Sequence, residues 1–156
     1  MHRGVKIAAG VLILWCLNSG CGDSDCAGFE RTPTSNAPWI SEVRLASQLS
    51  GDPWTAIFGV SFEDIDGDLA TTSLGKAEFF LDGNSAASVE LDTLFAQSSL
   101  EKNARTGEIA IPLRFSENIS DGASTVLGLQ LADNQKNRSN CYSLELDFAV
   151  STALSN

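Results

Sequence analysis

The segment Glu63-Asp64-Ile65-Asp66-Gly67-Asp68 holds the residues of this 156-residue chain best suited to chemistry. Its three aspartates, Asp64, Asp66 and Asp68, alternate along the chain, and Gly67 permits a tight turn among them. Carboxylates in such a turn can direct their oxygens into one small volume. Hard cations such as Ca²⁺ take about six to eight oxygen ligands of this kind. The spacing therefore makes the segment a candidate Ca²⁺ loop.

This loop is not an EF-hand. An EF-hand counted from Asp64 needs Gly at its sixth position and Glu at its twelfth, where this chain has Leu69 and Gly75. The alternative interpretation is that the three acids are solvated turn formers, since Asp, Asn and Gly dominate turns for local backbone reasons. The sequence leaves both interpretations open.

The elements that must position the loop are strands. Apolar residues alternate with polar ones from Trp39 onward, which is the pattern of half-buried β-strands. We expect seven short strands, around residues 43–49, 58–62, 77–81, 89–91, 109–115, 127–131 and 144–150. Pro112 cannot donate to a sheet, which predicts an edge or a bulge in the fifth strand. Residues 93–102 allow one helical turn before that strand. The pattern predicts an all-β sandwich of Ig-like architecture.

If the seven strands run alternately up and down, the second–third and sixth–seventh connections share one end of the sandwich. The first contains Asp64–Asp68, and the second contains Asp133, Asn134, Asn137 and Asn140. Oxygens from both loops would then meet around a cation. The candidate ligands are Asp64, Asp66, Asp68, Asp133 and Asn134.

The starts of the first and last strands fall at this same end, which places two cysteines near each other. Cys26 precedes the first strand and Cys141 precedes the last. In an oxidising compartment two cysteines usually pair, so a Cys26–Cys141 disulfide is expected, with two unpaired thiols as the alternative.

The first twenty residues differ in composition from the rest. A short basic start with Arg3 and Lys6 precedes an apolar run over residues 7–17, and small residues then lead to Cys21. This order is typical of a secretory signal, and eleven apolar residues reach only about 17 Å as a helix, too short to span a membrane.

Ser19, Gly20 and Cys21 resemble the lipobox of bacterial lipoproteins, although Leu17 lies one position before the Leu of that pattern. The resemblance implies that Cys21 is acylated and begins the mature protein. An ordinary cleaved signal and an uncleaved anchor are the alternatives. Gly22 after the cysteine implies delivery to the outer membrane or cell surface rather than retention at the inner membrane.

The strand region is similar to bacterial surface Ig-like domains. The segments SFEDIDGDL with KAEFFLDG resemble their second and third strands, and LQLADNQKNRSN resembles their last loop. The resemblance implies an Ig-like (fibronectin III/cadherin-like) β-sandwich. The chain then divides into a lipoprotein signal peptide (1–20), a flexible tether (21–38) and the sandwich domain (39–151).

Charge and residue types narrow the function. Without its signal the chain keeps 20 acidic and 8 of 10 basic residues, a net charge of −12, which argues against nucleic-acid binding. The only histidine is His2, so no catalytic base of that kind would survive cleavage, and we expect no enzyme. The sequence predicts a lipid-anchored envelope protein for surface structure, adhesion or binding of another envelope protein. The alternative is an accessory carbohydrate-binding module that uses Trp39 and Trp54.

Overall fold

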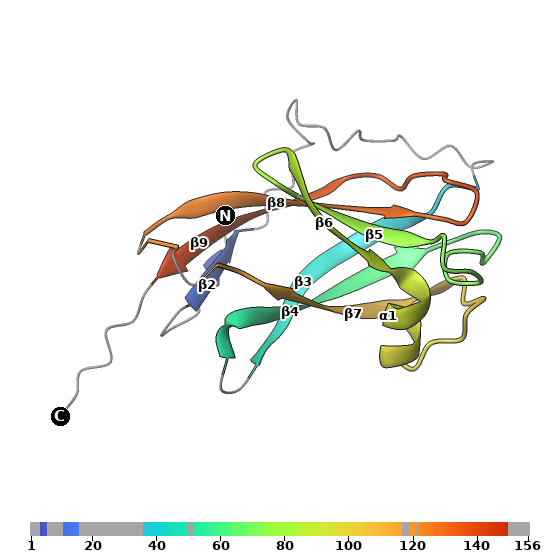
Figure 1. The fold of residues 1–156 in the computed structure, drawn as a ribbon, viewed down its shortest axis with the longest axis horizontal. Coiled ribbons are helices and arrows are strands. Elements are labelled where there is room, and N and C mark those ends of the chain that lie inside the picture. Colours follow the sequence, from blue (N-terminus) through green and yellow to red (C-terminus); the bar gives the residue numbers. More distant parts are fainter. Residues whose placement is uncertain are drawn as a thin grey trace.

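The chain folds into a β-sandwich, as the alternating pattern predicts. The computed structural model describes residues 4–5, 11–15, 36–49, 52–116, 119–120 and 122–149. One antiparallel sheet has the order β3-β4-β7, from β3 (Trp39–Leu49), β4 (Asp52–Glu63) and β7 (Thr106–Arg114). The facing sheet has the order β9-β8-β5-β6, from β5 (Lys76–Leu81), β6 (Asn84–Glu90), β8 (Ser124–Ala132) and β9 (Tyr142–Ala149). The three-plus-four arrangement is that of an Ig-like sandwich (Figure 1).

Two further short strands lie at the outer edge of β9. They are β1 (Gly4–Val5) and β2 (Val11–Trp15), and β2 runs antiparallel to β9, from Trp15 opposite Glu145 to Val11 opposite Ala149. Both strands belong to the segment that the sequence predicts as a signal. Its cleavage would therefore free the outer edge of β9.

The core lies between the sheets and consists of the inward positions of the alternating pattern. Successive residues of a strand face opposite sides of its sheet, so every second side chain points into the space between the sheets. The buried apolar residues that β4, β5, β8 and β9 contribute to this core are Ala56, Phe58, Val60 and Phe62 of β4, Ala77 and Phe79 of β5, Leu127, Leu129 and Leu131 of β8, and Leu144, Leu146 and Phe148 of β9. The predicted inward faces of these strands are confirmed.

Strand β3 departs from simple alternation. Ile40 and Val43 are both buried, 1% and 2% exposed, although an odd spacing puts two residues on opposite faces of a regular strand. A register shift between Ile40 and Glu42 inserts one extra residue, which turns both side chains inward.

The fourth strand, β6, pairs with β5 through a two-residue turn. Asp82 and Gly83 both have positive φ, 48° and 81°, as this tight hairpin turn requires. β6 ends at Glu90, so Leu91, expected in the strand, instead begins α1 (Leu91–Gln97). Pro112 lies in β7, an edge strand of its sheet, as predicted.

Helix α1 covers the open end of the core beside the loop that joins β4 and β5 (Figure 1). Its Leu91, Leu94 and Phe95 are buried, and the Phe95 ring lies 5.2 Å from that of Phe62. Burying such side chains contributes about 1.5–3 kcal/mol each. Within the part of the chain that the structure describes, no helix is long and apolar enough to cross a bilayer.

Candidate functional site

The β4–β5 loop closes on the carboxylate of Asp64, the residue that follows β4. The Asp64 N–H donates to the carbonyl oxygen of Arg105 at 2.7 Å, which fixes the loop to the segment before β7. Asp64 Oδ2 then accepts the N–H groups of Asp68 at 2.8 Å and Leu69 at 3.1 Å. The Oδ2 atom therefore holds the turn, and the Oδ1 atom makes no hydrogen bond within the structure.

Glycine is required at two positions of this loop. Gly67 has φ of 71°, and a Cβ there would lie 2.7 Å from the carbonyl oxygen of Asn103 in the segment between α1 and β7. A Cβ at Gly75 would lie 1.7 Å from the carbonyl oxygen of Leu69. The β4–β5 loop is thus folded tightly on itself and against the α1–β7 segment.

Three carboxylate oxygens converge inside the loop. One oxygen from each of Asp64, Asp66 and Asp68 lies within 4.8 Å of the others. The Oδ1 atom of each residue is buried and has no hydrogen-bond partner. Asp64 is only 1% exposed. An unpaired buried carboxylate oxygen is costly, and a proton or a cation among the three would offset that cost. The cluster is therefore a candidate cation site.

The electrostatics of the cluster agree with its geometry. Burial raises the pKa of the Asp64 carboxyl from 3.8 to about 7; the adjacent Asp66 carboxylate adds to this, and the N–H groups of Leu69 and Asp68 oppose it. Burial also raises the pKa of Asp68, with the Gln135 amide opposing and the charges of Asp133 and Asp66 adding. Removal of solvent and crowding of like charges thus both act against ionisation of these carboxyl groups.

The β8–β9 loop contacts the β4–β5 loop, called the acidic loop below, as the predicted strand directions require. Asn134 Nδ2 donates to the backbone oxygen of Asp68 and to Thr71 Oγ1, and its Oδ1 accepts from Thr72 Oγ1 at 2.7 Å. Gln135 Nε2 donates to Asp68 Oδ2 at 3.1 Å and lies 3.5 Å from Asp66 Oδ2. The β8–β9 loop therefore contacts both the backbone and the carboxylates of the acidic loop.

The five predicted ligands divide into two groups. Asp64, Asp66 and Asp68 converge, whereas Asp133 uses its carboxylate inside its own loop: Oδ1 accepts the N–H groups of Gln135 and Asn137 at 2.8 Å, and Oδ2 accepts Asn137 Nδ2 at 2.7 Å. Asp133 is fully buried. It shapes the loop that carries Asn134 and Gln135, and Asn134 in turn holds the Asp68 backbone.

Gln135 was missed by the sequence analysis. Its amide is the group of the β8–β9 loop that contacts the outer carboxylate oxygens, Oδ2 of Asp66 and Asp68. A glutamine in a polar loop has no spacing that marks it as part of a site. The available signal was its position next to Asn134, in the loop that the topology brings to the acidic segment.

The predicted cysteine sites lie partly outside the described residues. Cys21 and Cys26 are outside them, so acylation of Cys21 and pairing of Cys26 with Cys141 stay predictions. Cys141 is 9% exposed at the start of β9 and packs against Phe80, which is buried on the outer face of β5.

No protein-family model matches the chain, and no curated protein matches it. The function must therefore be argued from the site itself.

Proposed function

We propose that this chain is a lipid-anchored envelope protein whose Ig-like domain binds a structural cation, Ca²⁺, and is non-catalytic. Two observations carry the cation proposal: one carboxylate oxygen from each of Asp64, Asp66 and Asp68 converges with the others, and the Oδ1 atom of each residue is buried without a hydrogen-bond partner. A divalent cation would offset their mutual repulsion and their lost hydration together.

The donor set favours Ca²⁺ over other metals. All three donors are carboxylate oxygens, which suit hard cations, whereas zinc and copper sites usually include His or Cys. Ca²⁺ also tolerates irregular geometry and completes its shell with backbone oxygens and water, while Mg²⁺ demands a near-octahedral set. A loop that supplies three carboxylates within a few residues fits the more permissive ion.

The role proposed for the ion is to hold the loop end of the domain in one conformation. The acidic loop contacts the β8–β9 loop through Asn134 and Gln135, and it contacts the α1–β7 segment through Gly67. An ion in the acidic loop would therefore order a surface made from three connections. In Ig-like sandwiches, loops gathered at one end are a common place for contact with another protein.

Anchoring and absence of catalysis belong to the same proposal. The lipobox-like segment before Cys21 supports attachment to the envelope membrane, with the domain facing another envelope or surface protein. The lack of any histidine after His2 supports a binding or structural role rather than acid–base catalysis. The carbohydrate alternative finds less support, because Trp39 and Trp54 lie near opposite ends of the β3–β4 pair and cannot form one platform.

Calcium titration of the purified protein with Cys21→Ser tests the cation proposal. Isothermal calorimetry should show one site, and added Ca²⁺ should raise the melting temperature by mass action. Asp66→Asn with Asp68→Asn should abolish both effects. Glu101→Gln removes one exposed carboxylate from the same end of the domain and should leave both effects unchanged. Equal responses of the two variants, or no response of the parent protein, would refute the site.

Anchoring is tested separately. Cells expressing the full chain should incorporate radiolabelled palmitate into it and retain it in the membrane fraction, whereas Cys21→Ser should release it. Palmitate incorporation that survives this substitution would contradict the assignment of Cys21.

A further inference from the structure

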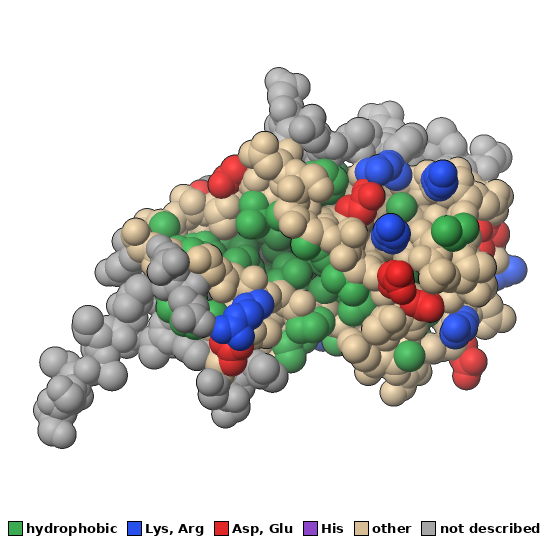
Figure 2. Space-filling model, viewed as in Figure 1, with side chains coloured by type: hydrophobic (Ala, Val, Ile, Leu, Met, Phe, Trp, Pro, Cys, Tyr) green, Lys and Arg blue, Asp and Glu red, His purple; other side chains and the backbone are tan. Residues whose placement is uncertain are grey.

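A cavity of about 510 Å³ opens between β6 and β7, away from the acidic loop and the β8–β9 loop. Figure 2 shows it as a hollow in which hydrophobic side chains are visible from outside. Its lining comes from five strands, β5 to β9, and from the segment between β7 and β8. The cavity thus reaches into the space between the two sheets and is more than a patch on one face.

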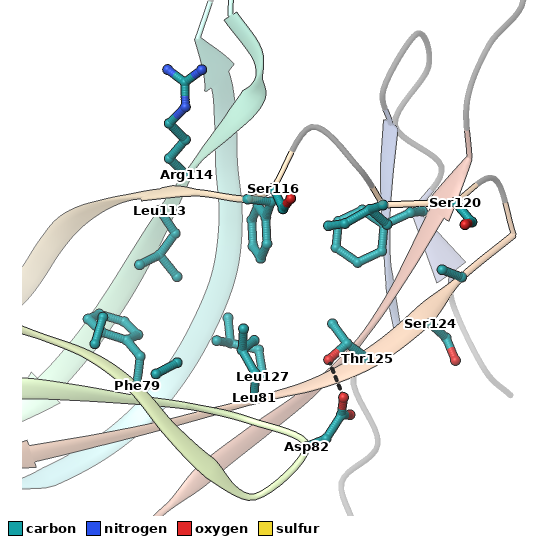
Figure 3. Close-up of a pocket in the computed structure, with 16 residues that line it drawn as sticks. Phe79, Leu81, Asp82, Leu113, Arg114, Ser116, Ser120, Ser124, Thr125 and Leu127 are labelled. Atoms are coloured by element: carbon teal, nitrogen blue, oxygen red, sulfur yellow. Dashed lines mark hydrogen bonds between the residues drawn. The ribbon is translucent and has the colours of Figure 1, made fainter.

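The walls of the cavity are apolar core side chains. Leu113 of β7 points across the space toward Phe79, Leu81 and Leu127 of the opposite sheet (Figure 3). Phe115 and Phe148, which also line it, pack edge to face with ring centroids 5.4 Å apart. These aromatic and branched side chains offer a ligand dispersion contacts and no hydrogen bonds.

The cavity is open because β6 carries small side chains. Ala86 and Ala87 line it and are exposed, and Ala87 pairs with Phe79 of β5. A leucine or phenylalanine at either position would extend into the hollow. In addition, β6 pairs only with β5, and β7 only with β4, among the described strands. No described strand therefore bridges the two sheets on this side.

The two charged residues at the mouth already have partners. Arg114 points away from the cavity in Figure 3 and pairs with Asp52 at 3.0 Å. The carboxylate of Asp82 accepts Thr125 Oγ1 at 2.9 Å and the N–H of Val126 at 2.8 Å. The remaining polar side chains among the described lining residues are serine and threonine hydroxyls, at Ser116, Ser120, Ser124 and Thr125.

We propose that this cavity binds a small, uncharged, apolar molecule. Its volume lies within the range of about 300–1,000 Å³ that is typical of small-molecule sites. Apolar walls select for hydrocarbon or aromatic surface, and a charged group would lose hydration that these walls cannot replace. A sugar would lose hydrogen bonds to water that these walls cannot replace. The ligand class is therefore hydrophobic and neutral.

Fluorescence of N-phenyl-1-naphthylamine, a neutral apolar probe, tests the proposal on the full-length protein with Cys21→Ser. We expect saturable binding of one probe per chain. Ala87→Phe should fill the hollow and weaken binding by at least about tenfold. Ala96→Phe makes the same change on the exposed surface of α1 and should leave binding unchanged. Thermal melts identify any variant that fails to fold, in which case Ala86→Leu replaces Ala87→Phe.

Competition by 1-dodecanol or by naphthalene then distinguishes an acyl-chain ligand from an aromatic one. Binding that does not saturate, or that Ala87→Phe and Ala86→Leu leave intact, overturns the proposal. So does light scattering that shows a dimer whose dissociation is needed for probe binding, because a second copy would then be the occupant. Probe binding should be the same in EDTA and in Ca²⁺, so the proposals for the cation site and for the cavity can be refuted independently.

Discussion

The buried Asp64 carboxyl predicts an unusual dependence of stability on pH when no cation is bound. Its pKa is raised from 3.8 to about 7, so the folded state holds a proton that the unfolded state releases. The stabilisation from this proton is fully present below about pH 4 and is lost as pH rises through 7. The whole shift corresponds to about 4 kcal/mol, at about 1.4 kcal/mol per unit of pKa.

Between about pH 5 and about pH 8, the same linkage predicts that the free energy of unfolding falls by about 2.5 kcal/mol in EDTA. Most proteins lose stability toward acid, because their paired carboxylates become protonated. Here the contribution of Asp64 has the opposite sign, and the raised pKa of Asp68 acts in the same direction. Saturating Ca²⁺ at about pH 8 should restore stability, by about 2.7 kcal/mol at a hundred times the dissociation constant.

Urea unfolding at several pH values, with EDTA or Ca²⁺, measures these changes. Asp64→Asn is the matched variant: its amide oxygen can still accept the N–H groups of Asp68 and Leu69, and its amide N–H faces the other carboxylates. We expect this variant to be at least as stable as the parent at about pH 8 in EDTA, with a flatter pH profile and no Ca²⁺ response. A parent protein that gains stability from about pH 5 to 8 in EDTA, or an unchanged slope in Asp64→Asn, would refute the reasoning.

Two further substitutions, Gly75→Ala and Asn140→Ala, test the packing that positions the site. Gly75→Ala places a Cβ against the carbonyl oxygen of Leu69 and should lower the free energy of unfolding in urea by about 3 kcal/mol. The control, Gly122→Ala, has a φ of 75° and open space around it, and should lower this free energy by about 1 kcal/mol. Equal losses would contradict the close approach at Gly75. Asn140→Ala removes two hydrogen bonds to the backbone of Ile40, 2.7 Å to its N–H and 2.9 Å to its carbonyl oxygen. It should lower the free energy of unfolding by about 2 kcal/mol. A loss below about 0.5 kcal/mol would show that water replaces these hydrogen bonds.

Much of the fold could be predicted because the central strands obey simple alternation. β4 and β8 are flanked by strands on both sides. β8 pairs with both neighbours and β4 pairs with β7 without a register shift, and Phe58, Val60 and Phe62 fall on one buried face. At the edge, β3 carries bulges, and a bulge changes which residues face inward without leaving a clear mark in composition. The inward position of Ile40 could therefore not be derived from periodicity.

The acidic loop was predictable in composition and the rest of the site was not. Alternating aspartates around a glycine indicated a turn that gathers carboxylates, and alternating strand directions indicated which loop would meet it. Which of Asp133, Asn134 and Gln135 contacts the cluster depends on the local turns of the β8–β9 loop. Asp133 accepts the N–H groups of its own loop, and this leaves Gln135 to reach the carboxylates.

The start of β3 at the acidic end has a consequence for how the molecule would stand on a membrane. Trp39 lies opposite Glu63, directly before the candidate cation loop, while the cavity opens toward the other end of the sheets. In a protein tethered through residues that precede β3, the acidic end is the end of the sandwich nearer the point of attachment, and the cavity opens at the end farther from it. The cation loop would then lie close to lipid headgroups and their bound divalent ions. The cavity would remain accessible to molecules arriving from the side facing away from the membrane.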